Sequence, residues 1–189
     1  NDWRHRFDTN LSALTALHPK VSIVIVTYNN VELTQGCIQS LLRNTTYPDY
    51  ELIIVDNASS DGSREWLQRW VAEPSKAGHV RRLILNDDNL GFSAGNNVGL
   101  RAATGEVLVM LNNDTYVTPG WVRGLCNHLR QDPGLGLLGP VTNNIGNEAK
   151  IDIQYADMAA MIAEAGKYTR RHAGHRLPLR TAAFFCVAM

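Results

Sequence analysis

The sequence lacks the features that mark several large classes of protein. It carries three cysteines, an odd number with no CxxC pair, so we interpret them as reduced thiols in a reducing compartment, the cytoplasm. The longest apolar runs, 21–26 and 107–111, are too short to span a bilayer, and no signal peptide opens the chain. Lys and Arg total 18 and Asp and Glu total 18, so the charge balance predicts no nucleic-acid partner.

Two nucleotide-binding signatures are also absent. No GxGxxG follows the first apolar run and no GxxxxGK[ST] loop occurs, which argues against NAD enzymes and P-loop NTPases. The length of 189 residues, with 44% hydrophobic and 19% charged residues, suits one globular domain with or without an appendage. There is no initiator Met and the sequence stops inside an apolar run, so we expect it to be a piece of a longer protein.

What the sequence does contain is an alternation of strand and helix patterns. Apolar, β-branched runs predict buried strands at 21–26, 50–55, 80–85 and 106–111. Helical spacing of apolar residues predicts helices at 31–44, 63–72, 93–103 and 119–131, with Gly105 as the C-terminal glycine of the helix at 93–103. The alternation predicts an α/β fold, with a mainly parallel sheet and helices on both faces. After about residue 135 the pattern loosens into turns, a weak helix at 158–165 and a basic stretch at 167–180.

A polar cluster follows each predicted strand. The clusters are residues 27–30, 56–61, 86–89 and 112–114. Ligands of open parallel sheets bind outside the carboxyl ends of the strands, so we expect one shared site. Asp56 is suited to accept a hydrogen bond from a base N–H, and Tyr28 is suited to pack beside the base. Asp114 is a hard oxygen ligand for Mg²⁺ or Mn²⁺, and such an ion would also bind phosphate oxygens. Trp121 follows this last cluster and is expected either to stack on a sugar or to pack the next helix.

Four segments in order carry a resemblance to a known family. VSIVIVTYN at 21–29, VDNASSDGS at 55–63, NLGFSAGNN at 89–97 and LNNDT at 111–115 resemble the family 2 glycosyltransferases with the GT-A fold, in particular their rhamnosyltransferase-like branch. The resemblance implies metal-assisted, inverting transfer of a sugar from a UDP- or dTDP-linked donor to a saccharide or lipid-linked acceptor. It also implies a role in cell-surface polysaccharide biosynthesis, in the cytoplasm or at the inner face of the membrane.

Carried over residue by residue, the resemblance implies a nucleotide-binding set and one metal ligand. The nucleotide-binding set is Thr27, Tyr28, Asn29, Asp56, Asp61, Asn89, Gly91, Asn96, Asn112 and Asn113. Asp114 is the implied ligand of Mg²⁺ or Mn²⁺, in a DxD-like motif where Asn112 replaces the first acid and leaves one charge fewer at the metal. The family's catalytic base follows a strand resembling 182–189, so we expect the base beyond Met189 and assign no catalytic residue.

The resemblance also divides the chain. It implies an N-terminal arm over 1–19, a nucleotide-sugar-binding GT-A domain over 20–140 and an incomplete, C-terminally truncated acceptor-side segment over 141–189. Two alternatives stay open: a truncated nucleotide-binding module without turnover, and a nucleotidyltransferase, which would favour a Gly-rich, Lys- or Arg-bearing signature at 27–30. We also expect the cut strand at 184–187 to leave an unpaired edge, and so to cause self-association or disorder of the terminus.

Overall fold

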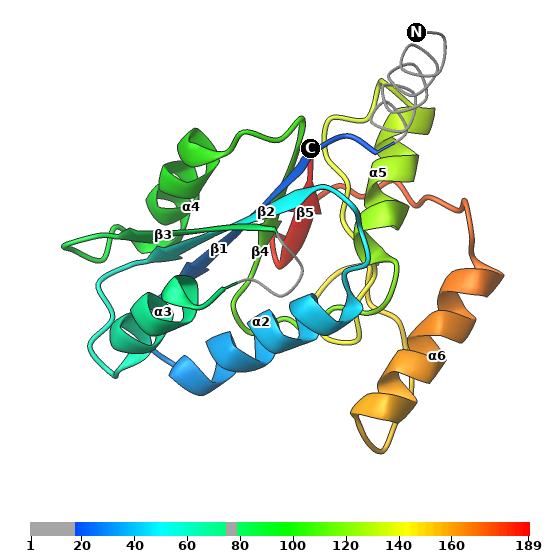
Figure 1. Ribbon diagram of the computed structural model, residues 1–189. Coiled ribbons are helices and arrows are strands. Elements are labelled where there is room, and N and C mark those ends of the chain that lie inside the picture. The colour runs from blue at the N-terminus through cyan, green and yellow to red at the C-terminus, as the bar shows by residue number, and fades with distance from the viewer. Residues whose placement is uncertain (1–17, 75–78) are drawn as a thin grey trace, which may run out of the picture.

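The described residues form a five-stranded sheet in a computed structural model that describes residues 18–74 and 79–189 (Figure 1). The arm expected over 1–19 lies almost entirely outside the described residues. The parallel strands are β1 (Val21–Thr27), β2 (Tyr50–Asp56), β3 (Val80–Leu85) and β4 (Val107–Leu111). The sheet order is β3-β2-β1-β4-β5, so the chain moves outward from β1 and then returns to its other side. That reversal places a topological switch point between β1 and β4.

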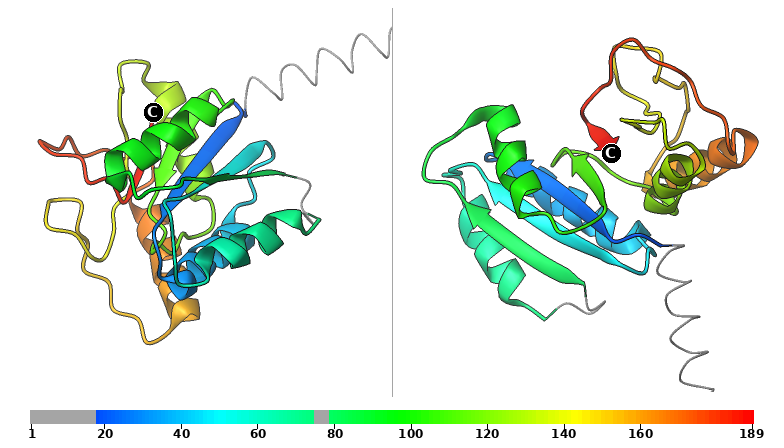
Figure 2. Two further views of the ribbon diagram at one scale, coloured as in Figure 1. Left: turned by 90° about the vertical axis from the view of Figure 1, so that its left-hand side faces the viewer. Right: turned by 90° about the horizontal axis from the view of Figure 1, so that it is seen from above.

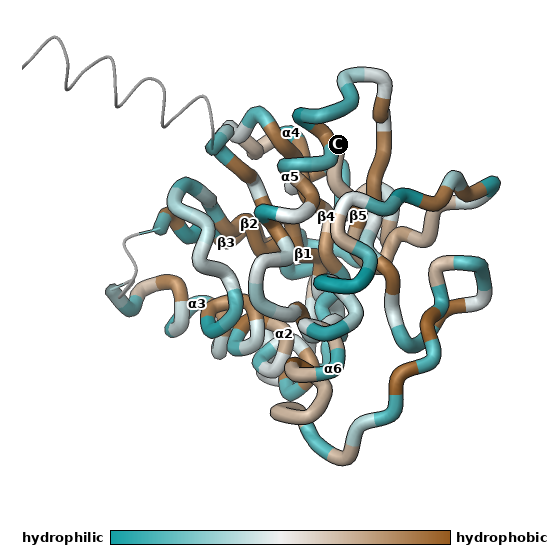
Figure 3. Tube along the Cα trace, turned by 90° about the vertical axis from the view of Figure 1, so that its right-hand side faces the viewer, coloured by the Kyte–Doolittle hydropathy of each residue, from teal (hydrophilic) through white to brown (hydrophobic). Residues whose placement is uncertain are grey.

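Helices cover both faces of this sheet, as the sequence predicts (Figure 2). Helices α2 (Val31–Asn44), α3 (Ser63–Ala72) and α5 (Trp121–Gln131) share a core with one face, and α4 (Gly91–Ala102) packs on the other. Strands β1, β2 and β4 carry mostly hydrophobic residues and are largely buried between the helices, whereas the edge strand β3 is exposed or half-buried (Figure 3). Helix α6 (Met158–Arg171) has no buried residue and lies apart from the sheet (Figure 1). None of the helices among residues 18–74 and 79–189 is long and apolar enough to cross a membrane.

Two glycines let α4 lie close to the strands beneath it. Gly95 and Gly99 are four residues apart on the buried face of the helix. A Cβ on Gly99 would collide with the side chain of Val24 and press on Val55, so only glycine permits this separation. Gly105, which the sequence suggests as a cap of this helix, instead lies against β1, where a Cβ would stand 2.6 Å from the backbone nitrogen of Ser22.

A buried carboxylate fastens the amino-terminal ends of the strands. Glu51 in β2 is fully buried, and its Oε1 accepts hydrogen bonds from the Ser22 hydroxyl at 2.7 Å and from the Thr104 amide and hydroxyl, each at 2.8 Å. Its Oε2 lies 3.4 Å from the Arg82 guanidinium. Burial alone would raise the pKa of Glu51, but the Ser22 and Thr104 donors and Arg82 outweigh it, so the pKa is lowered. The charged carboxylate therefore stabilises the fold.

The fifth strand lies at one edge of the described sheet. Strand β5 (Cys186–Ala188) is buried and pairs antiparallel with β4. Its outer side is also occupied, because Leu138 and Ala188 exchange backbone hydrogen bonds of 2.9 and 2.7 Å. The predictions of a disordered terminus and of a wholly unpaired apolar edge are therefore wrong, and self-association through this strand loses the physical reason on which it rested.

Candidate functional site

The four polar clusters lie at one edge of the sheet. The register pairs Thr27 with Asp56 and Asp56 with Leu85, so β1, β2 and β3 end level with one another. Strand β4 ends nearby at Leu111 on the other side of β1. The loops that follow these strands meet beside the β1–β4 switch point, where ligands of open parallel sheets bind.

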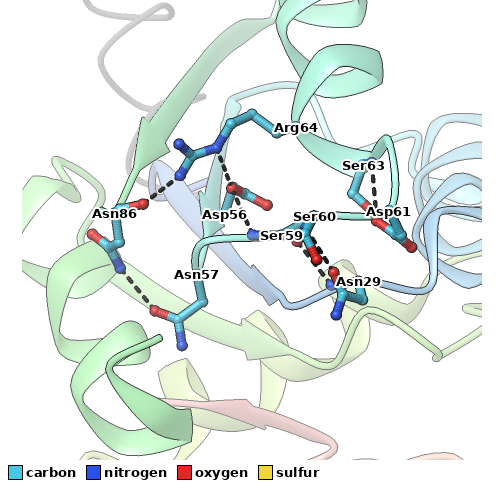
Figure 4. A network of polar contacts seen from close by, with 9 residues as sticks. All are labelled: Asn29, Asp56, Asn57, Ser59, Ser60, Asp61, Ser63, Arg64 and Asn86. Carbon is cyan, nitrogen blue, oxygen red and sulfur yellow. Dashed lines mark hydrogen bonds and ion pairs between the residues drawn. The ribbon is translucent and has the colours of Figure 1, made fainter. Parts of the chain in front are cut away.

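Reciprocal hydrogen bonds join the loop after β1 to the loop after β2 (Figure 4). The Asn29 amide donates to Ser59 Oγ at 2.8 Å, and the Ser60 amide donates to Asn29 Oδ1 at 2.8 Å. The Val31 amide donates to Asp61 Oδ2 at 3.1 Å. Hydrogen bonds to Asp61, first that from the Ser63 hydroxyl, lower the pKa of its carboxyl. Asn29 and Asp61, both in the predicted nucleotide-binding set, thus use their side chains to shape the loops.

Asp56 is held by an arginine that the sequence analysis did not single out. The Asp56 side chain is fully buried, and its Oδ2 accepts hydrogen bonds from Arg64 Nε at 2.9 Å and from the Ser59 amide at 3.3 Å. Arg64 also donates to the carbonyl oxygen of Asn86 beyond β3. The second oxygen, Oδ1, is buried without a hydrogen-bond partner among the described residues. Arg64 directly follows the VDNASSDGS segment, and that adjacency is the only signal in the sequence.

Asn57 is the second residue that the sequence analysis missed. It is 2% exposed, and its Nδ2 donates to Asn89 Oδ1 at 2.7 Å and to the Gly91 carbonyl at 3.2 Å. Its Oδ1 accepts from Asn86 Nδ2 at 2.9 Å and from the Leu90 amide at 3.1 Å. Asn57 therefore holds the turn between β3 and α4. Asn89 and Gly91, both predicted at the site, act in this turn through contacts within the protein.

The ends of β1 and β4 are tied together in the same way. Asn113 Nδ2 donates to the hydroxyls of Thr27 at 3.2 Å and of Thr34 at 3.0 Å, and these two hydroxyls lie 2.8 Å apart. Thr27 is 1% exposed. Thr27 and Asn113 therefore fix the carboxyl ends of β1 and β4 to each other, and their hydrogen-bonded groups are already paired.

Three of the predicted residues present side-chain groups that are not committed to other described residues. Tyr28 is 48% exposed, Asp114 is exposed and Asn112 is half-buried, and none of the three side chains makes a hydrogen bond within residues 18–74 and 79–189. Asn96 is nearly buried in α4, where its Nδ2 donates to the Phe92 carbonyl at 2.9 Å. Together with Oδ1 of Asp56, the groups of Tyr28, Asn112 and Asp114 are those that a ligand would engage.

Asp114 fits a divalent cation that is shared with a phosphorylated ligand. No group of three or more His, Cys, Asp or Glu that could enclose an ion occurs in the described parts of the chain. A single exposed carboxylate, completed by phosphate oxygens and water, is a usual ligand set for Mg²⁺. Cys37 lies close by, donating to the Asn112 carbonyl at 3.4 Å, but burial raises its pKa to about 12, so it offers no thiolate to a metal.

Trp121 packs away from this site. Its indole nitrogen donates to Thr45 Oγ1 at 2.9 Å. Thr45 directly follows α2 and precedes β2, so it lies at the edge of the sheet where the parallel strands begin. The prediction that Trp121 stacks on a sugar is therefore contradicted. A cavity of about 390 Å³ also lies at this edge, where the strands begin, opposite to their carboxyl ends. It is lined by residues 45–50 with Lys20, His79 and Val80. The cavity therefore does not mark the site that the polar clusters form.

The sequence is similar to a known protein family and to individual members of it. A family model described as glycosyl transferase family 2 matches residues 22–186. The glycosyltransferase AglE of Haloferax volcanii is 31% identical over 111 residues, and the chondroitin synthase of Escherichia coli is 32% identical over 120 residues. These matches cover 58% and 64% of this chain, which in turn spans 35% and 17% of the length of the two proteins.

Solved structures share the same architecture. The mannosyltransferase PcManGT from Pyrobaculum calidifontis, solved with GDP-Man and Mn²⁺, matches with a TM-score of 0.59 and 26% identity. That match covers 66% of this chain and 36% of the other. Staphylococcus aureus TarS 1-349, solved with UDP-GlcNAc, matches with a TM-score of 0.51 and 19% identity over 59% of this chain and 31% of that one. The sheet is therefore that of the GT-A glycosyltransferases, as predicted.

Proposed function

Because this chain belongs to glycosyl transferase family 2, we propose that it binds a nucleotide-diphosphate sugar for transfer to an acceptor hydroxyl. The observation that carries the proposal is the set of open polar groups at the carboxyl ends of β1, β2 and β4. There the uncommitted groups of Tyr28, Asn112 and Asp114 and an unpaired oxygen of Asp56 come together. A base, a ribose and a diphosphate need a ring contact, hydrogen-bond acceptors and a cation, and these groups supply them.

In this proposal the nucleoside lies beside the loops that follow β1 and β2. Tyr28 packs beside the base, and Asp56 Oδ1 accepts from a base N–H. Asn29 and Asp61 act by fixing the two loops that flank the base. The wall near the ribose and the sugar is shaped by Asn89, Gly91 and Asn96. Asn89 and Gly91 accept hydrogen bonds from Asn57 in the turn before α4, and Asn96 bonds the Phe92 carbonyl within α4.

The diphosphate occupies the β4 side. Asn112 would meet the ribose, and Asp114 would hold Mg²⁺ or Mn²⁺ beside the diphosphate. Thr27 and Asn113 fix the ends of β1 and β4 that carry these groups. When bound, the ion neutralises charge on the departing nucleoside diphosphate. Asn112 is neutral, so the protein contributes one carboxylate, and the affinity for the ion depends strongly on the nucleotide being present.

The transfer step is an inverting displacement at the anomeric carbon, with an oxocarbenium-like transition state. The carboxylates nearest the chain's end are already used, since Asp157 caps α6 by accepting from the Ala160 amide and Glu164 pairs with Lys167. The resemblance in the sequence implies that the base follows a strand similar to 182–189, so we assign no described carboxylate as the base that deprotonates the acceptor.

The finer parts of the proposal follow the resemblance in the sequence. The sugar donor is UDP- or dTDP-linked and the acceptor is a saccharide or lipid-linked saccharide for cell-surface polysaccharide. Cys37, Cys126 and Cys186 are free and buried, which fits a reducing compartment such as the cytoplasm, with the protein there or at the inner face of the membrane. Membership of the rhamnosyltransferase-like branch stays a prediction.

Calorimetric titration tests the proposal directly. UDP, dTDP and GDP are titrated into the chain with and without Mn²⁺, and into the Asp114→Asn and Glu65→Gln variants. We expect Mn²⁺ to strengthen nucleotide binding by about tenfold or more in the unaltered chain and in Glu65→Gln, an exposed control on α3, but not in Asp114→Asn. The proposal is overturned if no nucleotide binds, or if Asp114→Asn keeps the full effect of Mn²⁺.

A further inference from the structure

We propose that Arg64 is a specificity-determining positioning residue, which fixes Asp56 so that the site selects a uracil-type base. This inference rests on the proposed nucleotide site. Arg64 is the second residue of α3, and its guanidinium reaches across the end of β2 to the carbonyl oxygen of Asn86 beyond β3 (Figure 4). On the way it donates from Nε to Asp56 Oδ2 at 2.9 Å. One side chain thus joins α3, β2 and the turn after β3.

These contacts leave the two oxygens of Asp56 unequal. Oδ2 is occupied by Arg64 and by the Ser59 amide, whereas Oδ1 is buried and has no partner among the described residues. A buried carboxylate oxygen without a hydrogen bond costs free energy, and a ligand N–H would recover that cost. Oδ1 is buried, so the proposal includes a small local opening beside Asp56 that admits the base and keeps both contacts of Oδ2.

The pair also fixes the charge and direction of the acceptor. The Arg64 side chain, 29% exposed, is the described cation in contact with the fully buried Asp56 carboxylate, and this pairing offsets the cost of burying the charge. Because Arg64 Nε and the Ser59 amide both hold Oδ2, the carboxylate cannot turn to follow a donor elsewhere on the base. The site therefore offers one acceptor in one place.

One fixed acceptor matches the imide N–H of uracil or thymine, which stands alone between two carbonyl groups. Cytosine carries a lone pair at the same ring atom, and its amino group is displaced by one position. Guanine presents two adjacent donors, which suit a carboxylate with both oxygens free, and here one oxygen is taken. Without Arg64, Asp56 is free to turn toward other donors, so discrimination between bases falls.

Binding of UDP and CDP measures this selectivity with two bases of nearly equal size. The titrations use the unaltered chain, Arg64→Ala, Arg64→Lys and Arg69→Ala, an exposed control on the same helix. We expect UDP to bind about tenfold or more tightly than CDP to the unaltered chain and to Arg69→Ala, the size expected of one hydrogen bond to a charged group. In Arg64→Ala we expect the ratio of the CDP to the UDP dissociation constant to approach one. Arg64→Lys keeps the charge but loses the planar guanidinium with its several N–H donors, so we expect an intermediate ratio.

The ratio separates positioning from mere support of the fold. If Arg64 only ties α3 to the sheet, its loss weakens UDP and CDP equally, the ratio is unchanged and the inference is overturned. If Arg64→Ala does not fold, as judged by circular dichroism, Arg64→Lys decides, and a ratio equal to that of the unaltered chain overturns the inference. UDP binding without preference over CDP in the unaltered chain refutes base selection but leaves the proposed function standing. Absence of any nucleotide binding overturns both.

Discussion

Replacing Glu51 tests the energetics that hold the strands in place below the site. Glu51→Ala removes a fully buried carboxylate that accepts three hydrogen bonds from Ser22 and Thr104 and lies 3.4 Å from Arg82. The donors of Ser22 and Thr104 lose their common acceptor, and Arg82 loses its counterion. Breaking a buried, hydrogen-bonded charge in this way costs roughly 3–5 kcal/mol of unfolding free energy. Glu51→Gln keeps a carbonyl acceptor but not the charge, so we expect a loss of about 1–3 kcal/mol.

Urea unfolding followed by circular dichroism, repeated as a function of pH, measures both losses. The pKa of Glu51 is lowered in the folded chain, so its stabilisation is complete above the unfolded pKa of about 4.3 and is lost as the pH falls through the folded value. The difference between the unaltered chain and Glu51→Gln should therefore shrink in acid. Glu106→Ala, at an exposed acid next to β4, is the control and should change stability by less than about 0.5 kcal/mol. A pH-independent difference, or a loss in Glu51→Ala no larger than in Glu106→Ala, would refute the reasoning.

Three further predictions concern packing, thiols and the turn before α4. Gly99→Ala should lower the unfolding free energy by about 1–3 kcal/mol, because the new Cβ collides with the sheet. Gly124→Ala, which has open space around it in α5, should raise the unfolding free energy by about 0.5–1 kcal/mol. Equal effects of the two variants in thermal melts would contradict the close packing of α4. A thiol reagent at pH 8 should leave Cys37 unlabelled until urea is added, because burial raises its pKa to about 12, and rapid native labelling would disprove this burial. Asn57→Ala should speed hydrogen exchange of the Leu90 amide, and an unchanged rate would show that Asn57 does not hold the turn.

The fold was predictable because the pattern that encodes it is local. The cores of the runs Val21–Thr27 and Tyr50–Asp56 are continuously apolar, as is typical of strands covered on both faces, and the helices between them keep their spacing. The predictions differ from the structure around α4, where tertiary packing outweighs the local sequence pattern. Helix α4 begins at Gly91 rather than at Ser93, and Gly105 is required by its approach to β1 rather than by a helix cap. Such approaches depend on tertiary packing and leave no local signal.

The candidate site was predictable in position but less so in the duties of its residues. Polar clusters after parallel strands must meet at one edge, so Tyr28, Asp56 and Asp114 could be placed from the sequence. Which side chains remain open to a ligand depends on partners that lie far away in the sequence, as in the bond between Val31 and Asp61, which are 30 positions apart. Arg64 shows the same dependence, because its partner beyond β3 becomes visible only in the folded chain.

The central claim is that a nucleotide and a divalent cation bind at the carboxyl edge of the strands. Paramagnetic broadening of amide NMR signals by Mn²⁺, recorded with and without UDP, tests it most directly. The account predicts UDP-dependent broadening that is strongest around Asp114 and reaches 27–31 and 56–62, while 45–50 at the opposite edge stays sharp. Broadening centred on 45–50, or broadening that does not depend on UDP, would contradict the account.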